Sequence, residues 1–76
     1  MVYRLRLRDL REDFDLNQTR VAEYLGIDQR TYSNYETEKR SMPMEHYRKL
    51  AELYHTSVDY LIGLTDERKP YPRGRK

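Results

Sequence analysis

The segment 17–36 is divided by a single glycine, Gly26, and this division constrains the fold more than any other feature of the chain. Asn17 is a good N-cap for a short helix, because its side chain can accept a hydrogen bond from a free backbone N–H. The apolar side chains of that helix follow at helical spacing: Val21, Ala22 and Leu25. Gly26 ends the helix, since glycine takes a left-handed conformation at no steric cost. Asp28 is then a good N-cap for a second helix. The segment therefore predicts two short helices joined by a tight turn.

The second of these helices has two different faces. One face carries side chains fit for a core: Tyr32, Tyr35 and Glu36. The other carries polar side chains: Gln29, Arg30, Ser33 and Asn34. In a major groove, glutamine and asparagine pair with adenine, and arginine pairs with guanine. Two helices in this arrangement meet the geometric needs of a helix-turn-helix. A solvated face that binds nothing is the alternative, and the composition of the face leaves it open.

Three further helices are expected around this pair. The first is indicated by an apolar stripe that continues as far as Phe14, although the alternation of apolar residues and arginines in 3–8 also fits a strand. Its stripe consists of Tyr3, Leu7, Leu10 and Phe14, and Asp15 is expected to end it. Pro43 suits the first turn of a fourth helix. The stripe of that helix is Tyr47, Leu50, Ala51 and Tyr54. Ser57 is expected to cap a short fifth helix, which carries Val58, Leu61 and Ile62 and ends at Gly63.

The pattern predicts an all-α domain of five short helices over residues 1–65, followed by a flexible basic tail over 66–76. A chain of 76 residues has room for one core only. The net charge is +2, and the tail holds five basic and two acidic residues, so the folded part is nearly neutral. Binding to a polyanion would therefore depend on the local arrangement of charges, with the tail as an optional extra contact.

Several classes of function are disfavoured by the residues themselves. The chain has no cysteine, which excludes disulfides, thiolate nucleophiles and cysteine-bound metals. His46 and His55 have no clear ligand partners, so we expect neither a metal nor another cofactor. Motifs for phosphate loops and catalytic serines are absent, and so small a fold hardly encloses a pocket, so we do not expect an enzyme. No signal sequence or membrane span is apparent, which favours a cytoplasmic protein with no membrane partner.

The run of residues from Asn17 to Glu36 resembles the helix-turn-helix of the phage lambda repressor and Cro type, also called XRE-like. Residues 4–62 fit the five-helix domain of that family. Several features agree in register: Arg11 lies seven residues before Gln18, Ala22 and Gly26 are four apart, and Glu36 ends the third helix. The segments 32–36 and 59–66 are also similar to small regulators of Gram-positive bacteria.

This resemblance implies a role for each matching residue. Base contacts are implied for the polar face of the third helix, which is Gln29, Arg30, Ser33 and Asn34. Phosphate contacts are implied for Asn17, Gln18, Thr31, Lys39 and Arg40, and Gln18 would also brace the third helix. A structural salt bridge is implied between Arg11 and Glu36. Three departures from the family pattern concern the backbone and the core: a glycine that is usual near Asp15 is absent, Glu38 stands where relatives often have glycine, and tyrosines at 32 and 35 replace the usual aliphatic residues.

The resemblance further implies a sequence-specific DNA-binding transcriptional regulator, a repressor more than an activator. Its partner would be double-stranded DNA, read at an inverted-repeat operator by a homodimer that forms at least on DNA. The dimer surface is expected near the fifth helix, at Tyr60, Leu61 and Leu64. The alternative from another class is an antitoxin or anti-repressor that uses the same fold to bind a protein partner, whose identity is unknown.

Overall fold

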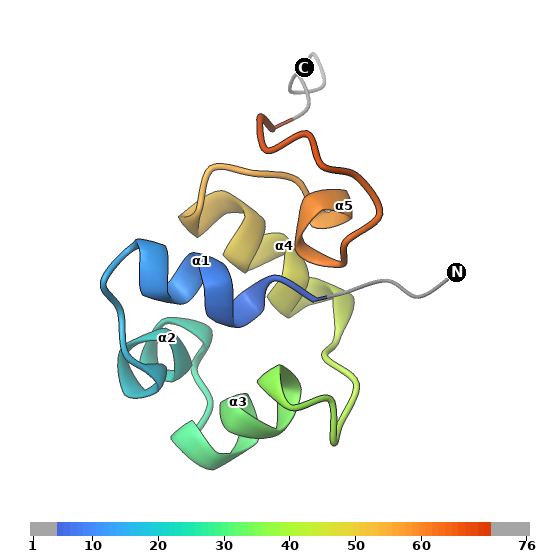
Figure 1. Ribbon diagram of the computed structural model, residues 1–76. Coiled ribbons are helices and arrows are strands. Elements are labelled where there is room, and N and C mark those ends of the chain that lie inside the picture. Colours follow the sequence, from blue (N-terminus) through green and yellow to red (C-terminus); the bar gives the residue numbers. More distant parts are fainter. Residues whose placement is uncertain (1–4, 71–76) are drawn as a thin grey trace.

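A computed structural model describes residues 5–70 of the chain, and in this range the regular structure is helical (Figure 1). The five helices are α1 (Leu7–Asp13), α2 (Gln18–Leu25), α3 (Gln29–Glu36), α4 (Met44–Leu53) and α5 (Val58–Leu61). The predicted all-α fold with five short helices is confirmed. None of the helices in the described part of the chain is long and apolar enough to cross a membrane.

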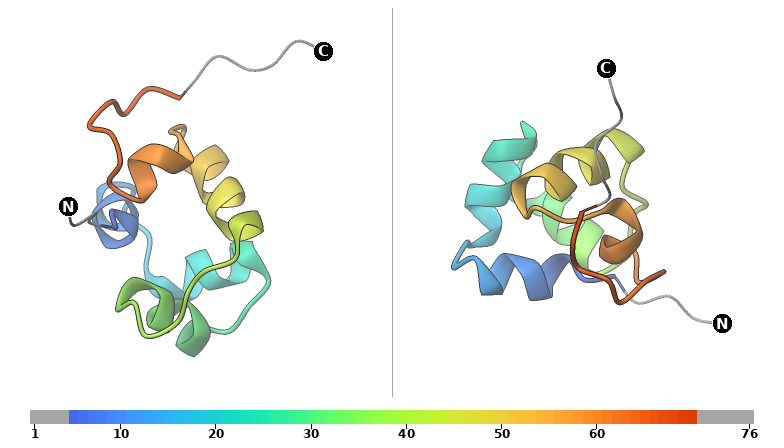
Figure 2. Two further views of the ribbon diagram at one scale, coloured as in Figure 1. Left: turned by 90° about the vertical axis from the view of Figure 1, so that its right-hand side faces the viewer. Right: turned by 90° about the horizontal axis from the view of Figure 1, so that it is seen from above.

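All five helices contribute side chains to one core, around which they are arranged in the views of Figures 1 and 2. The buried apolar side chains are Leu7, Leu10, Val21, Ala22, Leu25, Tyr32, Tyr35, Met42, Leu50, Ala51, Tyr54 and Leu61. Two of the largest of these are tyrosines, Tyr32 and Tyr54, so aromatic rings supply much of the packing.

The turn between α2 and α3 has the predicted construction. The side chain of Asn17 accepts a hydrogen bond from the backbone N–H of Arg20, at 2.8 Å, and so caps α2. Gly26 has a φ of 77°, in the left-handed region, and ends the helix. The side chain of Asp28 accepts from the backbone N–H of Thr31, also at 2.8 Å, and so caps α3. Each cap satisfies a backbone donor that the first turn of a helix leaves unpaired.

The predicted start of the first helix was too early. The helix begins at Leu7, and Tyr3 lies outside the described residues. Leu5 and Arg6 are not helical, and the backbone N–H of Arg6 donates to the carbonyl of Leu61 at 2.8 Å. The chain therefore contacts α5 at a point where the apolar stripe suggested a helical turn.

The ends of the other helices differ only slightly from the prediction. Pro43 is the residue immediately before α4 and has an extended conformation. Ser57 caps α5 by accepting from the backbone N–H of Tyr60, as expected, and the helix ends at Leu61. Gly63 follows with a φ of 84°.

Within residues 5–70, three residues other than glycine adopt positive φ. Asp15 has a φ of 57° and Glu38 has a φ of 62°, so the backbone is left-handed at both positions for which the resemblance drew attention to glycine. Aspartate tolerates this conformation better than most residues, so the turn at Asp15 forms without glycine. Glu38 lacks that tolerance, and its turn is strained. His55, at 54°, was not anticipated.

Arg6 ties the two ends of the described chain together. Its guanidinium donates to the carbonyls of Tyr60 and Thr65 at 2.7 and 2.8 Å, and it pairs with Asp66 at 2.7 Å. The group also lies 4.1 Å from the centre of the Tyr60 ring. The carbonyl of Arg68 accepts from the hydroxyl of the buried Thr56 at 2.7 Å. These contacts fix the first residues of the predicted tail against the domain, and residues 71–76 lie outside the described part.

Substitution of Gly26 tests the turn. An added Cβ would meet no atom within 4 Å, so the cost of Gly26→Ala comes from backbone strain alone. We expect a loss of about 1–2 kcal/mol in the free energy of unfolding, measured in urea. Gly26→Asn should lose less, because asparagine tolerates the left-handed region. Equal losses for the two variants would show that the conformation of Gly26 is not the cause.

Candidate nucleic-acid interface

The four residues predicted to read bases lie on α3. Gln29 and Arg30 are exposed at the first turn of the helix, and Ser33 and Asn34 are half-buried one turn later. The opposite side of the helix is anchored by Tyr32 and Tyr35 in the core. The polar side chains therefore point away from the core along one short helix.

The residues predicted to contact phosphate lie at both ends of this face. Asn17 and Gln18 begin α2, and Thr31 lies in the first turn of α3. Lys39 and Arg40 are exposed in the loop after α3, and their backbone N–H groups donate to the carbonyl of Asn34 at 2.9 and 3.3 Å. The carbonyl of Asn34 thereby holds both cationic residues close to the C-terminus of α3.

The carboxylate of Glu36 joins α1, α2 and α3. Arg11 donates to it through Nε at 2.7 Å and through a terminal nitrogen at 3.3 Å, so the predicted ion pair is present. Gln18 donates to Oε1 at 3.0 Å, and the hydroxyl of Tyr32 donates to Oε2 at 2.7 Å. The side chains of the pair are 12% exposed for Arg11 and 5% for Glu36. The angle of α3 against the other two helices is therefore fixed by a buried charge with four hydrogen bonds.

The pKa of Glu36 reflects these contacts. Burial acts to raise the pKa, but the hydrogen bonds from Arg11, Tyr32 and Gln18 outweigh it and hold the pKa below its usual range. The hydrogen bond between Arg11 and Glu36 also raises the pKa of the Arg11 guanidinium. For Tyr32, burial and the contact with Glu36 both raise the pKa, so the hydroxyl keeps its proton.

An ionised carboxylate only accepts hydrogen bonds, and this fixes the orientation of two amides in turn. Gln18 must present its nitrogen to Glu36, so its amide oxygen faces Gln29. Gln29 donates its own amide nitrogen to that oxygen. The amide oxygen and the second N–H of Gln29 then remain for a ligand, and this is the acceptor and donor pair that adenine requires. The bracing role of Gln18 thus has a definite geometry.

One contact of this arrangement did not follow from the sequence. Tyr32 and Glu36 are one helical turn apart, and this spacing was a usable signal, but the sequence analysis placed Tyr32 in the core and named no partner for its hydroxyl.

The dimer surface predicted near α5 needs a correction, because Leu61 is 0% exposed and belongs to the core. Leu64 is exposed, whereas Tyr60 is half-buried beneath the guanidinium of Arg6.

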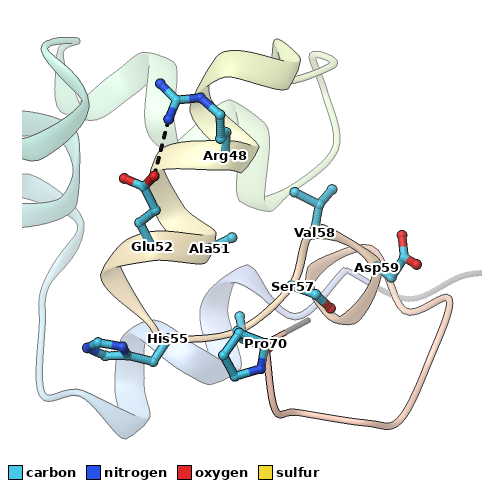
Figure 3. Close-up of a pocket in the computed structure, with 9 residues that line it drawn as sticks. Arg48, Ala51, Glu52, His55, Ser57, Val58, Asp59 and Pro70 are labelled. Atoms are coloured by element: carbon cyan, nitrogen blue, oxygen red, sulfur yellow. Dashed lines mark hydrogen bonds and ion pairs between the residues drawn. The ribbon is translucent and has the colours of Figure 1, made fainter. Parts of the chain in front are cut away.

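A hollow of about 440 Å³ is lined by residues of α4, of α5 and of the segment between them, and no residue of α3 lines it (Figure 3). Ala51 and Val58 contribute apolar surface, and Pro70 lies at its edge. Glu52 on its rim is paired with Arg48 at 3.2 Å, as Figure 3 shows.

The comparison with known families decides the relationship of the chain. Residues 7–61, which include all five helices, match the family model described as Helix-turn-helix. The chain belongs to the helix-turn-helix family. This confirms the resemblance that was drawn from residues 17–36.

Individual members of the helix-turn-helix family are similar over most of the chain. The HTH-type transcriptional regulator YobD of Bacillus subtilis is 42% identical over 69 residues, which are 91% of this chain and 62% of YobD. The cryptic phage CTXphi transcriptional repressor RstR of Vibrio cholerae is 38% identical over 58 residues, 76% of this chain and 52% of RstR. The chain thus spans about half to two thirds of the length of these relatives.

The fold also has a counterpart among solved structures. The crystal structure of a transcriptional regulator from Listeria innocua superposes with a TM-score of 0.79 at 26% sequence identity. The match covers 88% of this chain and 64% of the Listeria chain.

The low pKa of Glu36 predicts a dependence of stability on pH. A carboxylate whose pKa is lowered by folding stabilises the fold above its unfolded pKa, about 4.3, and this stabilisation is lost as the pH falls through the folded value. Near pH 7 we expect Glu36→Gln to cost on the order of 3 kcal/mol in unfolding free energy, because Arg11 stays buried without a counter-ion. The difference from the unsubstituted protein should shrink below about pH 4.3.

Chemical denaturation between pH 3 and 7 measures this difference. Glu12→Gln is the matched control, because Glu12 forms an exposed ion pair with Arg8 on α1. Its effect should be small at every pH. A Glu36→Gln difference that stays constant across this range would contradict the prediction.

Proposed function

We propose that this chain is a sequence-specific DNA-binding transcriptional regulator, and a repressor more than an activator. The observation that carries the proposal is the face of α3, where Gln29, Arg30, Ser33 and Asn34 point away from the core on a helix of eight residues. A helix of this size fits the major groove of B-form DNA. The names of the relatives, which are transcriptional regulators and in one case a repressor, support it.

In this proposal α3 lies in the major groove. Gln29 presents the acceptor and donor pair that suits adenine, and Arg30 can pair with guanine beside it. Ser33 and Asn34 reach bases one helical turn further along. The network that ends on Glu36 orients Gln29 before DNA arrives, which lowers the entropy lost on binding.

The proposed phosphate contacts lie on both sides of the polar face of α3. The amide nitrogen of Asn17 can donate to a phosphate, because its oxygen already caps α2. Gln18 and Thr31 lie near the N-termini of the two helices, where the positive end of each helix favours an anion. Lys39 and Arg40 supply the cationic contacts after α3. These contacts position the protein and carry no sequence information themselves.

The charge of this surface favours recognition by hydrogen bonds over general attraction to DNA. Residues 17–40 hold four basic and four acidic side chains, so the segment has no net charge.

The α3 helix of one protein molecule reads only a few base pairs. We therefore propose a homodimer on an inverted repeat, with half-sites about 34 Å apart.

The alternative function is that of an antitoxin or anti-repressor that binds a protein partner. The hollow between α4 and α5 would be its candidate surface, since no residue of α3 lines it. The helix-turn-helix surface itself could also hold the partner, but the side chains on the polar face of α3 suit the hydrogen-bonding groups of bases, and for this reason we favour DNA binding.

Selection of bound sequences from a random duplex pool at about 150 mM salt tests the proposal, because non-specific phosphate binding is weakened there. We expect an inverted repeat to be enriched. A single half-site would contradict the dimer, and no enrichment by the folded protein would favour the protein-binding alternative.

Alanine substitutions then test the assignment of individual residues. Gln29→Ala, Arg30→Ala and Asn34→Ala should each cost roughly 1–3 kcal/mol in binding to the selected sequence and relax the preference at one base pair. Lys39→Ala should weaken binding to selected and random duplexes alike. Titrations against both duplexes measure this, and equal losses on both for the α3 variants would contradict base reading.

A further inference from the structure

The core holds two buried tyrosines whose hydroxyls are in different surroundings. Tyr32 on α3 is 0% exposed, and its hydroxyl donates to Oε2 of Glu36 at 2.7 Å. Tyr54, the residue after α4, is 1% exposed, and its hydroxyl has no hydrogen-bond partner among the described residues. Phenylalanine would fill the space of either ring. Only the hydroxyl of Tyr32 is therefore explained by a specific contact.

The hydroxyl of Tyr32 donates to the carboxylate of Glu36, which also orients two polar side chains of the interface, Gln18 directly and Gln29 through Gln18. Oε2 of Glu36 accepts from Tyr32 and from Nε of Arg11, whereas Oε1 accepts from Gln18 and from a terminal nitrogen of Arg11. Each oxygen thus has two donors, which restrains rotation of the carboxylate. Without the hydroxyl, Oε2 would keep Arg11 alone, and water could not replace the lost donor at a buried ring.

The position of Oε1 matters because the amide of Gln18 follows it. Gln18 donates to Oε1, and Gln29 donates to the oxygen of Gln18. A rotation of the carboxylate would therefore change the placement of Gln18 and then that of Gln29. The path from Tyr32 to Gln29 consists of three hydrogen bonds in series.

We propose that Tyr32 is a positioning residue for base reading: its hydroxyl fixes the carboxylate of Glu36, and through Gln18 this fixes the amide of Gln29. Tyr32 itself lies in the core and touches no DNA. The inference rests on the proposed function for its DNA readout, but the chain of hydrogen bonds exists in the free protein. It can therefore be tested both with and without DNA.

The first experiment compares Tyr32→Phe with the matched control Tyr54→Phe in the free protein. Spectra of the side-chain amides, recorded by ¹⁵N NMR well below the melting temperature, report on Gln18 and Gln29 directly. We expect both amides to shift in Tyr32→Phe and to keep their positions in Tyr54→Phe. Unshifted Gln18 and Gln29 signals in a folded Tyr32→Phe would overturn the proposal. If that variant does not fold, the unsubstituted protein provides the second test: the hydroxyl proton of Tyr32 must be protected from exchange with solvent, and a rapidly exchanging hydroxyl would overturn the proposal.

The second experiment measures discrimination, the ratio of affinities for the selected duplex and a random duplex. Tyr32→Phe should lower this ratio about fivefold, within the range for an indirect contact, and leave affinity for random DNA unchanged. Tyr54→Phe should keep the ratio. In a Gln18→Ala background, Tyr32→Phe should have no further effect, because the path is already interrupted.

The outcomes separate this inference from the proposed function. If the unsubstituted protein discriminates and Tyr32→Phe discriminates equally well, the positioning role is wrong and the DNA-binding function stands. If Tyr32→Phe loses affinity equally on both duplexes, its role is only structural. If the unsubstituted protein itself does not discriminate, the proposed function fails, and the amide spectra alone decide whether Tyr32 orients Gln18.

Discussion

The buried carboxylate of Glu36 is the interaction on which the rest of the interface depends. A charge removed from water is costly unless donors replace the lost hydration, and here Arg11, Gln18 and Tyr32 supply them. These donors come from three helices, so satisfying the charge requires α1, α2 and α3 to take one mutual arrangement. A purely apolar contact would tolerate sliding, whereas directional hydrogen bonds do not. The orientation of α3 is therefore a consequence of charge compensation.

Much of this fold could be predicted because it depends on local signals. Asn17, Gly26 and Asp28 mark the ends of α2 and α3 through the conformations and caps that these residue types favour. The start of α1 could not be predicted in the same way. The apolar stripe begins at Tyr3, but the helix begins at Leu7, after Arg6, whose backbone N–H donates to the carbonyl of Leu61, and no local pattern reveals a partner so distant in the sequence.

The candidate site likewise has parts that the sequence predicts and parts that it does not. The polar face of α3 follows from helical spacing, and the pair of Arg11 and Glu36 followed from the resemblance to a family. The hydroxyl of Tyr32 and the link between Gln18 and Gln29 required coordinates, because a tyrosine in an apolar stripe gives no sign of what its oxygen meets. The DNA contacts themselves stay predictions.

The contacts of Arg6 bear on the order in which the molecule can open. They join residues 54 to 60 positions apart, whereas the side-chain contacts of Glu36 span no more than 25. Fraying termini open with the smallest free energies in local unfolding, and closing a longer loop costs somewhat more chain entropy. Fraying of both ends can thus occur while α1, α2 and α3 stay together. Figures 1 and 2 place residues 66–70 on the side of the molecule away from α3, so release of the Arg6 contacts takes place at a distance from the polar face of α3.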